Sequence, residues 1–178
     1  CDAIIADYNY VFDPVVYLRR FFDSKNRDSI ALVDEAHNLV DRGRDMFSAE
    51  VNKESYLAIA KICQHSAPAV MKAARKVTRA FHGYKKRHEI EFEEHGYITG
   101  YEIPEAVVSA MQTFCSSAEE ELRNEVYGSF RDELLSCYFD TLRFLRTAEN
   151  FDADYAVLFQ HQSKKHYLKL YCMDPSRQ

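Results

Sequence analysis

The sequence predicts a mostly α-helical protein of the α+β class: a helical bundle, a small parallel βαβ unit near the N-terminus and a C-terminal β-hairpin. Glycine and proline are few, 5 and 4 among 178 residues, which favours long helices over turn-rich β structure. Apolar residues recur at helical spacing through the middle of the chain. Short continuous apolar runs stand at 3–6 and 30–33, and an alternating run stands near the end.

The first elements expected are a strand over 3–6, a helix over 15–22 and a second strand over 29–33. Pro14 suits the first turn of a helix, with Asp13 as its cap. A strand–helix–strand unit predicts parallel strands with a right-handed crossover. Because two parallel strands are not stable alone, they need partner strands that this chain does not obviously supply. The start at Cys1, directly before a strand, also suggests a piece of a longer protein.

The middle of the chain is expected to form a succession of helices whose apolar stripes build the core of a bundle. Their expected ranges are 38–47, 52–65, 67–94, 104–128 and 130–150. Gly43 weakens the first of them, Asn52 caps the second and Gly96 ends the third. Residues 97–101 are expected to be a loop. Runs at 155–159 and 167–171 flank a turn-like 162–165, which predicts a hairpin.

Two adjacent acids follow the 29–33 run, and the sequence there reads Asp34-Glu35-Ala36-His37. In open α/β sheets, ligands bind just beyond the carboxyl ends of the strands. An acid pair at that place can hold Mg²⁺ and orient an attacking water, and His37 can hydrogen-bond a neighbouring segment. The alternative is a strand end whose acids cap the next helix.

Composition excludes some classes of function. The net charge of −5 does not indicate a nucleic-acid binder on average, although a local basic face can coexist with it. The five cysteines form no Cys-x-x-Cys pair, which argues against structural zinc and a disulfide framework and favours reduced intracellular thiols. No apolar run approaches the roughly 18 residues of a membrane span, and no signal peptide opens the chain, so no membrane partner is expected.

One local basic face is indicated on the long helix. Lys72, Arg75, Lys76 and Arg79 follow helical spacing, and such a row can bind the phosphates of a single strand. The alternative is a solvated helix face, balanced by the acidic patch from Glu89 to Glu94.

Several of these stretches together resemble one known family. They are Ala3-Ile-Ile-Ala-Asp-Tyr-Asn-Tyr-Val-Phe-Asp-Pro14, a run ending in Asp34-Glu35-Ala36-His37-Asn38, a long helical insertion, and Cys172-Met-Asp-Pro-Ser176. In this order they resemble the XPD/DinG family of superfamily 2 DNA helicases, and the bacterial DinG-like branch is nearer than the eukaryotic one.

The resemblance implies roles for the acidic motif, which in that family is the Walker B, or DEAH, box. Asp34 would position the Mg²⁺ of ATP through water, Glu35 would activate the hydrolytic water, and His37 would couple nucleotide state to the neighbouring motor motifs. Tyr8 and Tyr10 would lie where family members approach DNA.

The resemblance also implies a domain division. Residues 1–47 would be a fragment of a RecA-like motor domain, 48–153 a helical arch-like domain over the single strand, and 154–178 a hairpin returning to the motor domain. In a bacterial cell the parent would act in the cytoplasm at the nucleoid, in processes such as DNA repair.

The departures from the family pattern restrict what this chain can do. Its glycines form no Gly-x-x-x-x-Gly-Lys-[Ser/Thr] phosphate loop, and no arginine-finger segment is recognisable. Many relatives hold an iron–sulfur cluster on cysteines upstream of the first strand, but Cys1 lies too close to that strand to match. The parent is therefore expected to use ATP and Mg²⁺, with or without a cluster, to translocate on single-stranded DNA. This chain alone is expected to hold no cluster and to be inactive.

Two rival readings remain. The chain could be a helical protein–protein docking module in which Asp34, Glu35 and His37 are structural, and an arch-like domain could itself bind a protein partner besides the rest of the helicase chain. A free-standing metal hydrolase is disfavoured, because three residues are a thin ligand set.

Overall fold

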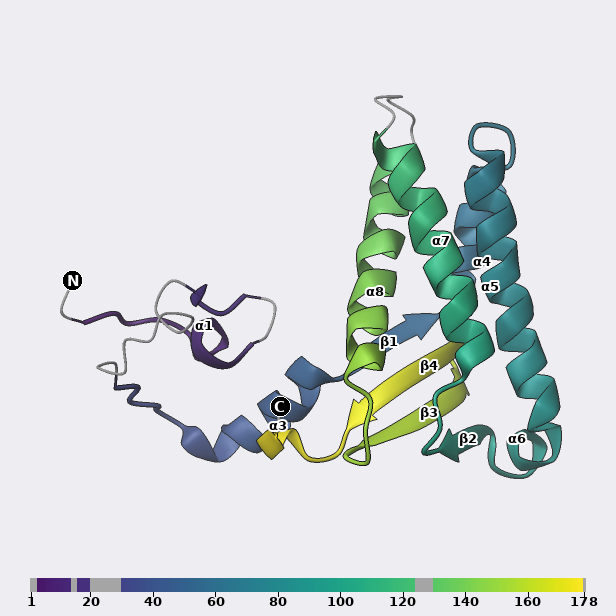
Figure 1. Cartoon of the computed structure of the whole chain (residues 1–178). Helices are drawn as coiled ribbons and strands as arrows, with labels where there is room; N and C mark the ends of the chain where they lie inside the picture. The colour runs from purple at the N-terminus through teal and green to yellow at the C-terminus, as the bar shows by residue number, and fades with distance from the viewer. Residues whose placement is uncertain (1–2, 14–15, 20–29, 124–129, 178) are drawn as a thin grey trace.

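Four long helices stand on one face of a four-stranded antiparallel sheet in the computed structural model of the chain (Figure 1). The structure describes residues 3–13, 16–19, 30–123 and 130–177. The upright helices are α4 (Lys53–Ile62), α5 (Pro68–Arg87), α7 (Glu105–Arg123) and α8 (Arg131–Glu149). The shorter helical elements are α1 (Asn9–Phe12), η1 (Ala36–Asn38), α3 (Leu39–Phe47), α6 (Glu89–His95) and η2 (Pro175–Arg177).

The sheet has the strand order β1-β4-β3-β2, and every neighbouring pair is antiparallel. Its strands are β1 (Ala49–Asn52), β2 (Tyr97–Gly100), β3 (Tyr155–Gln162) and β4 (Lys165–Cys172). β3 and β4 form a hairpin whose two turn residues, Ser163 and Lys164, have φ values of 50° and 67°. A two-residue type I′ turn requires positive φ at both positions, and its twist matches that of the flanking strands.

One face of the sheet is buried against the helices. Val157 and Phe159 alternate with half-buried residues along β3, and Leu168 and Leu170 do the same on β4. This period of two is what places a strand between a core and solvent. The helices contribute aromatic rings to the same core: Tyr56 and Phe114 meet edge to face with centroids 5.2 Å apart.

Local sequence signals set several helix ends. The Asn52 side chain accepts a hydrogen bond from the backbone N–H of Ser55 at 2.9 Å and so caps α4. Pro68 opens α5, where its missing N–H costs nothing. Gly96 ends α6 with φ at 76°, a conformation that glycine adopts without strain.

The predicted α+β class, the predominance of helix and the C-terminal hairpin are confirmed. The expected parallel βαβ unit is wrong for the described residues, because 3–7 and 30–33 adopt no regular secondary structure and the sheet is antiparallel throughout. Parallel strands are normally buried on both faces, and among the described residues neither a strand nor a helix covers these two stretches. The expected helix over 15–22 lies largely outside the described residues.

Three further differences concern the middle of the chain. Residues 97–100, expected to be a loop, form β2, and β1 was not predicted. The expected 67–94 helix is two helices, because the backbone leaves helical geometry at His88 (φ −112°, ψ 33°). Gly43 does not interrupt α3; a Cβ there would lie 3.0 Å from Pro175, so its side of the helix packs on the C-terminal segment.

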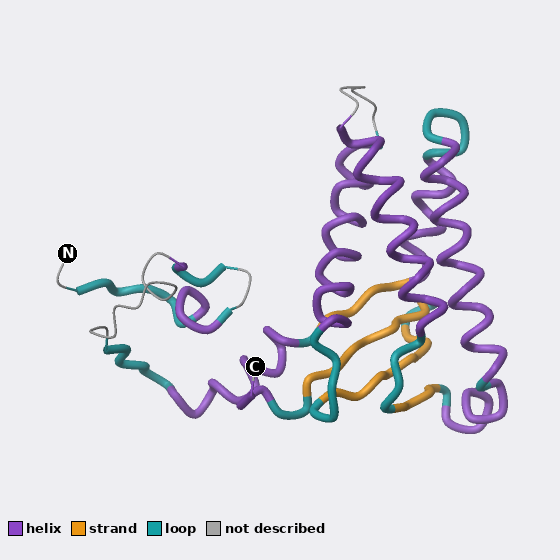
Figure 2. Tube along the Cα trace, viewed as in Figure 1, coloured by secondary structure: helices purple, strands orange, loops and turns teal. Residues whose placement is uncertain are grey.

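The described residues before Ser48 form a segment apart from the core. None of them is buried, and Figure 2 shows this N-terminal segment extending away from the helices and the sheet. It joins the remainder through α3, where Arg44 Nε donates to the Met173 carbonyl at 3.0 Å. The hairpin thus pairs with β1 and β2, and the residues after β4 contact α3. The division at 47/48 and 153/154 stays a prediction. None of the described helices is both long and apolar enough to cross a membrane.

A buried hydrogen-bond chain provides a test of the core. Thr141 Oγ1 donates to the Cys137 carbonyl at 2.6 Å, so the Tyr56 hydroxyl, 2.8 Å away, must donate to Thr141. Burial raises the pKa of Tyr56 well above its usual value, which keeps this donor protonated. Tyr56→Phe should lower the free energy of unfolding by about 1 kcal/mol, measured by urea denaturation.

Thr141→Val should cost more, about 1–3 kcal/mol, because it leaves the buried Tyr56 hydroxyl without an acceptor. Thr78→Val is the matched control, since Thr78 makes a similar bond to the Arg75 carbonyl on the exposed side of α5. It should change stability by less than about 0.5 kcal/mol. A Thr141→Val variant as stable as this control would contradict the assignment of donor and acceptor.

Candidate functional site

The acidic motif lies in the N-terminal segment, where it follows residues 30–33, and its last two residues, Ala36 and His37, begin η1. Glu35 is in the left-handed region, with φ 51° and ψ 36°, which turns the chain into η1. The Asp34 carboxylate accepts the backbone N–H of Glu35 at 2.9 Å, and the Asn38 N–H donates to the Glu35 carbonyl at 2.9 Å. A left-handed residue that is neither Gly nor Asn is uncommon, and such residues cluster at ligand sites and switch regions.

Glu35 and His37 are brought together. Their Oε2 and Nδ1 atoms lie 3.3 Å apart, with side chains 68% and 74% exposed. Exposed pairs of this kind contribute little to stability, about 0–1 kcal/mol. The pair is therefore available to a ligand or to another part of a larger site at small cost.

The donor set of the motif suits a hard cation. Carboxylate oxygens of Asp34 and Glu35 are the ligands that Mg²⁺ prefers, and Mg²⁺ sites often use one or two carboxylates with the rest of the shell from water and phosphate. Among the residues that the structure describes, no group of three or more His, Cys, Asp or Glu could hold a metal ion. The motif therefore offers two carboxylates, which are part of the ligand set that Mg²⁺ takes in proteins.

Tyr8 and Tyr10 lie in the same segment, at α1. Tyr8 precedes the first residue of this short helix, and Tyr10, inside it, is 45% exposed. Residues 20–29, between α1 and the acidic motif, lie outside the described part of the chain.

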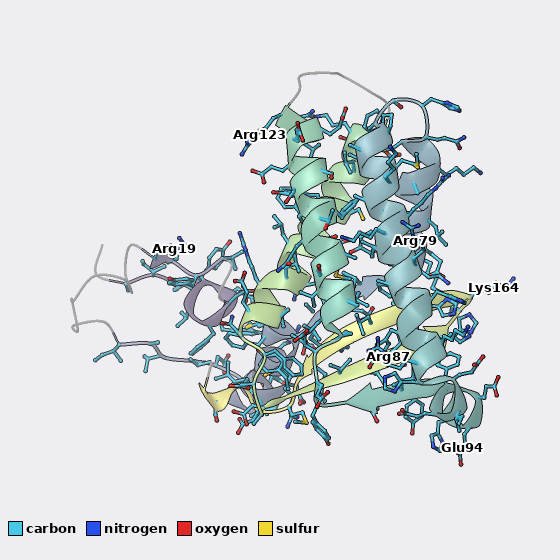
Figure 3. The ribbon with its side chains drawn as sticks, turned by 45° about the vertical axis from the view of Figure 1, so that its right-hand side comes forward. Arg19, Arg79, Arg87, Glu94, Arg123 and Lys164 are labelled. Atoms are coloured by element: carbon cyan, nitrogen blue, oxygen red, sulfur yellow. The ribbon has the colours of Figure 1, made fainter. Side chains whose placement is uncertain are left out.

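The predicted basic face is present on α5. Its four cations, Lys72, Arg75, Lys76 and Arg79, are all exposed. The opposite side of the helix is buried; its core residues are Val70, Ala73, Ala74, Val77 and Phe81. Figure 3 shows Arg79 on the outer surface of the helix. We call Lys72, Arg75, Lys76 and Arg79 the basic row.

Ion pairs among the described residues do not neutralise the basic row. The ion pairs found among the described residues involve none of its four members, and the Lys76 ammonium donates to Thr113 Oγ1 on α7 at 3.1 Å. The acidic patch expected to balance it lies beyond the break at His88, on α6. There Glu91 accepts the Thr99 N–H at 2.9 Å and lies 3.7 Å from His88 Nδ1.

The structure does not bring the acidic motif and the basic row together. In the view of Figure 1 the N-terminal segment extends to one side, and α5 stands on the opposite side of the bundle. The two predicted sites are therefore separate surfaces of the described chain.

A cavity that sequence reasoning missed lies at the C-terminal end of α5. It has a volume of about 390 Å³, and its polar lining residues are Lys53, His82, Lys85, Lys86, Glu89 and His166. These come from α4, α5, α6 and β4, so no local spacing in the sequence could have indicated them. We call it the basic cavity.

The comparisons concern the first third of the chain. The family model DEAD_2 matches residues 1–56. This model describes a DEAD-like helicase domain, and the match includes Tyr8, Tyr10 and the whole Asp34–His37 motif. The domain is found in XPD/DinG-type helicases, which agrees in part with the resemblance and indicates an ATP-dependent helicase parent. No curated protein matches the chain.

The exposure of the acidic motif predicts how its substitution affects stability. Asp34→Asn and Glu35→Gln should each change the free energy of unfolding by less than about 0.5 kcal/mol, because neither side chain is buried. Urea denaturation measures this. Thr141→Val serves as the destabilising reference. A loss above about 1 kcal/mol in either variant would instead assign the acids a structural role.

Proposed function

We propose that this chain is part of an XPD/DinG-type DNA helicase, comprising the DEAH box and an arch-like helical domain. The parent enzyme couples ATP hydrolysis to translocation on single-stranded DNA. The observation that carries the proposal is the DEAD_2 match over residues 1–56, which contains the acidic motif.

The exposure of the N-terminal segment supports the proposal. The side chains of Ile5, Ile30 and Leu32 are 103%, 89% and 95% exposed. Each of them lies in a short apolar run of the kind that is typical of buried strands. Exposed apolar side chains gathered in one segment mark a surface that another element covers. In the parent, strands of the first motor domain would cover these residues on both sides, as parallel sheets require.

Within such a motor domain the acidic motif has defined roles. Asp34 would hold the Mg²⁺ that accompanies ATP, and Glu35 would orient and activate the hydrolytic water. His37, which already contacts Glu35 at 3.3 Å, couples the state of that carboxylate to neighbouring motifs. Tyr8 and Tyr10 contact the DNA strand from the same domain.

The same proposal assigns each part of the chain to a domain of the parent. Residues 1–47 belong to the motor domain, 48–153 form the arch-like domain over the strand, and 154–178 return the chain toward the motor domain. We further propose that the parent belongs to the DinG-like branch, acts at the nucleoid and takes part in DNA repair. An iron–sulfur cluster would belong to another part of the parent. The partners are single-stranded DNA, the rest of the helicase chain and a protein bound to the arch.

The basic row is proposed to bind the single strand. Reversing all four charges, with Lys72, Arg75, Lys76 and Arg79 changed to Glu, should weaken binding of a short oligothymidylate by more than about tenfold. The slope of log K against log salt should become less steep by up to about 3, because each neutralised phosphate of a single strand contributes about 0.7. Fluorescence anisotropy across a salt series measures both.

A matched control separates the basic row from net charge. Arg42→Glu with Lys61→Glu reverses two exposed cations on α3 and α4, and is compared with Arg75→Glu and Arg79→Glu. Only the second pair should weaken binding. The basic row would be ruled out as the binding surface if both double variants lost the same affinity for the strand. An unchanged salt slope in the fourfold variant would rule it out as well. If the unmodified chain binds no strand at any salt concentration, the helical protein-docking role is favoured instead.

The isolated chain should not hydrolyse ATP above background, with or without single-stranded DNA, because its sequence has no phosphate loop. Phosphate release in the presence of Mg²⁺ and ATP measures this, and Glu35→Gln is the control. Hydrolysis that Glu35→Gln abolishes would show that the chain contains a complete site, contrary to the proposal.

A further inference from the structure

We propose that the basic cavity at the C-terminal end of α5 binds a phosphate group. The proposal rests on the charge of its lining, on a histidine held in a defined orientation, and on an open path along α5. It goes beyond the DNA-binding proposal for the basic row, because the cavity would bind an isolated phosphate even if the row bound no strand.

The lining of the cavity is positively charged. Its lining residues include three lysines, Lys53, Lys85 and Lys86, and one acid, Glu89. Lys53 forms an ion pair with Glu54, but its Nζ and Oε1 atoms lie 3.9 Å apart, which is a weak contact. Lys85 Nζ lies 4.3 Å from the centre of the Phe92 ring, a contact that orients the ammonium without neutralising it. Lysine ammonium groups bind phosphate as compact point charges.

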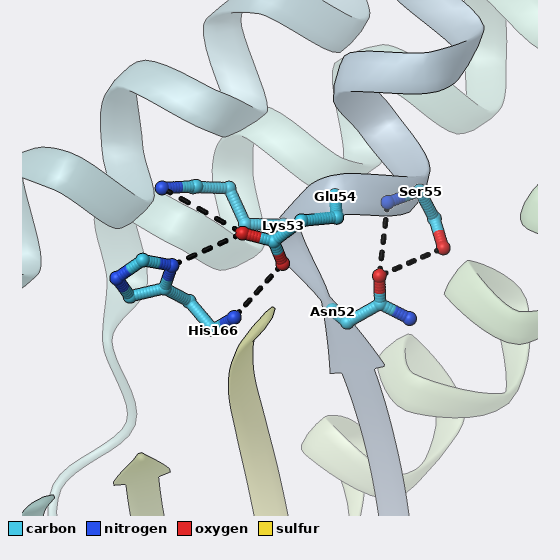
Figure 4. A network of polar contacts seen from close by, with 5 residues as sticks. All are labelled: Asn52, Lys53, Glu54, Ser55 and His166. Carbon is cyan, nitrogen blue, oxygen red and sulfur yellow. Dashed lines mark hydrogen bonds and ion pairs between the residues drawn. The ribbon is translucent and has the colours of Figure 1, made fainter. Parts of the chain in front are cut away.

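His166 is held in place by Glu54. The Glu54 carboxylate accepts the backbone N–H of His166 at 2.8 Å, and its other oxygen lies 3.0 Å from Nδ1 of the ring (Figure 4). Burial raises the pKa of Glu54, but the hydrogen bonds from His166 and the charge of Lys53 together lower it by more. The net pKa shift is therefore downward, and the carboxylate is ionised. An ionised carboxylate only accepts, so Nδ1 carries the proton and Nε2 is left for a ligand.

The orientation of the two groups favours a shared ligand. In Figure 4 the ammonium end of Lys53 and the imidazole ring of His166 extend to the same side of the Glu54 carboxylate. Both residues line the cavity. When His166 is neutral its Nε2 is an acceptor, and when it is protonated Nε2–H becomes a charged donor to a phosphate oxygen.

Binding should therefore depend on pH. Burial lowers the pKa of His166, and the charges of Lys53 and His161 add to this, whereas the bond to Glu54 opposes it; the net pKa shift is downward. The charged and titratable groups around it are Lys53 and Glu54 on α4, His161 on β3, His82, Lys85 and Lys86 on α5, and Glu89 on α6. Because an anion favours the protonated ring, affinity rises as pH falls through the pKa of His166.

The path to the cavity runs along α5. Lys86 continues the helical spacing of Lys72, Lys76 and Arg79, and Gly83 occupies the position between Arg79 and Lys86. A Cβ at Gly83 would meet nothing within 4 Å. Packing thus does not require glycine there, although glycine inside a helix costs about 0.5–1 kcal/mol relative to alanine. The absent side chain leaves the backbone open to a ligand that reaches the cavity.

Two probes test the proposal on the full chain: inorganic phosphate and a short oligothymidylate. Both are followed by the NMR signals of the His166 ring and, for the oligonucleotide, by anisotropy. Lys86→Gln and Lys85→Gln should each weaken binding about five- to tenfold, the loss expected for one charge-assisted contact. Lys61→Gln removes a charge at the other end of α4 and should leave affinity unchanged.

The oligothymidylate serves for the pH series, because a phosphodiester does not titrate between about pH 6 and about pH 8, whereas inorganic phosphate does. Affinity should rise as the pH falls below the ordinary pKa of histidine, because the pKa of His166 is lowered. His166→Gln should abolish this rise, and His161→Gln should preserve it.

The two probes distinguish the sources of phosphate. If only inorganic phosphate shifts the His166 signals, the cavity binds a free phosphate; if the oligothymidylate does so, the cavity binds the backbone of a strand. Both results support the cavity. It is ruled out if neither probe shifts these signals, or if Lys86→Gln and Lys61→Gln behave alike. Reversing the charges of the basic row should weaken binding of the oligothymidylate and leave binding of inorganic phosphate unchanged. A wrong proposal for the basic row and a wrong proposal for the basic cavity therefore give different results.

Discussion

The structure depends on the hairpin of β3 and β4. β1 and β2 are only four residues long, and each is part of the sheet because one edge of the hairpin offers it a partner. The buried face of the hairpin also supports the helices. Around Phe159 the rings of Phe81, Tyr84 and Phe92 lie with centroids 6.0, 5.6 and 5.8 Å away. The hairpin therefore links strands far apart in sequence and supplies the apolar surface that the helices bury.

The described residues of the N-terminal segment have no such apolar surface to pack against, and none of those before Ser48 is buried. Its apolar runs resemble those of the core, yet residues such as Ile5 and Leu32 are fully exposed. A strand needs a neighbour for its backbone hydrogen bonds and a covering layer for its side chains. The DEAD_2 match covers this segment and only the start of the helical region, so the exposed residues and the helicase-like sequence coincide.

The basic row and much of the lining of the basic cavity lie on one helix, α5. α5 buries one side against α4 and α7 and exposes cations on the other, and the break at His88 places the glutamates on α6. The positive charge is thus concentrated along α5 and at its C-terminal end in spite of the net charge of −5. Average charge is a poor guide to binding when opposite charges lie on different elements.

The sequence by itself determined most of the helical stretches, the cap at Asn52, the end at Gly96 and the hairpin, because each depends on residues within a few positions of one another. It did not indicate the break at His88. It also indicated the basic row, whose spacing is local, and it singled out the acidic motif, whose roles stay predictions. Only the tertiary structure decided that 97–100 pairs with β3, that 30–33 forms no strand, and that Lys53, Lys86 and His166 line one cavity. These features depend on which distant segment is available as a partner, and neither propensity nor periodicity records that.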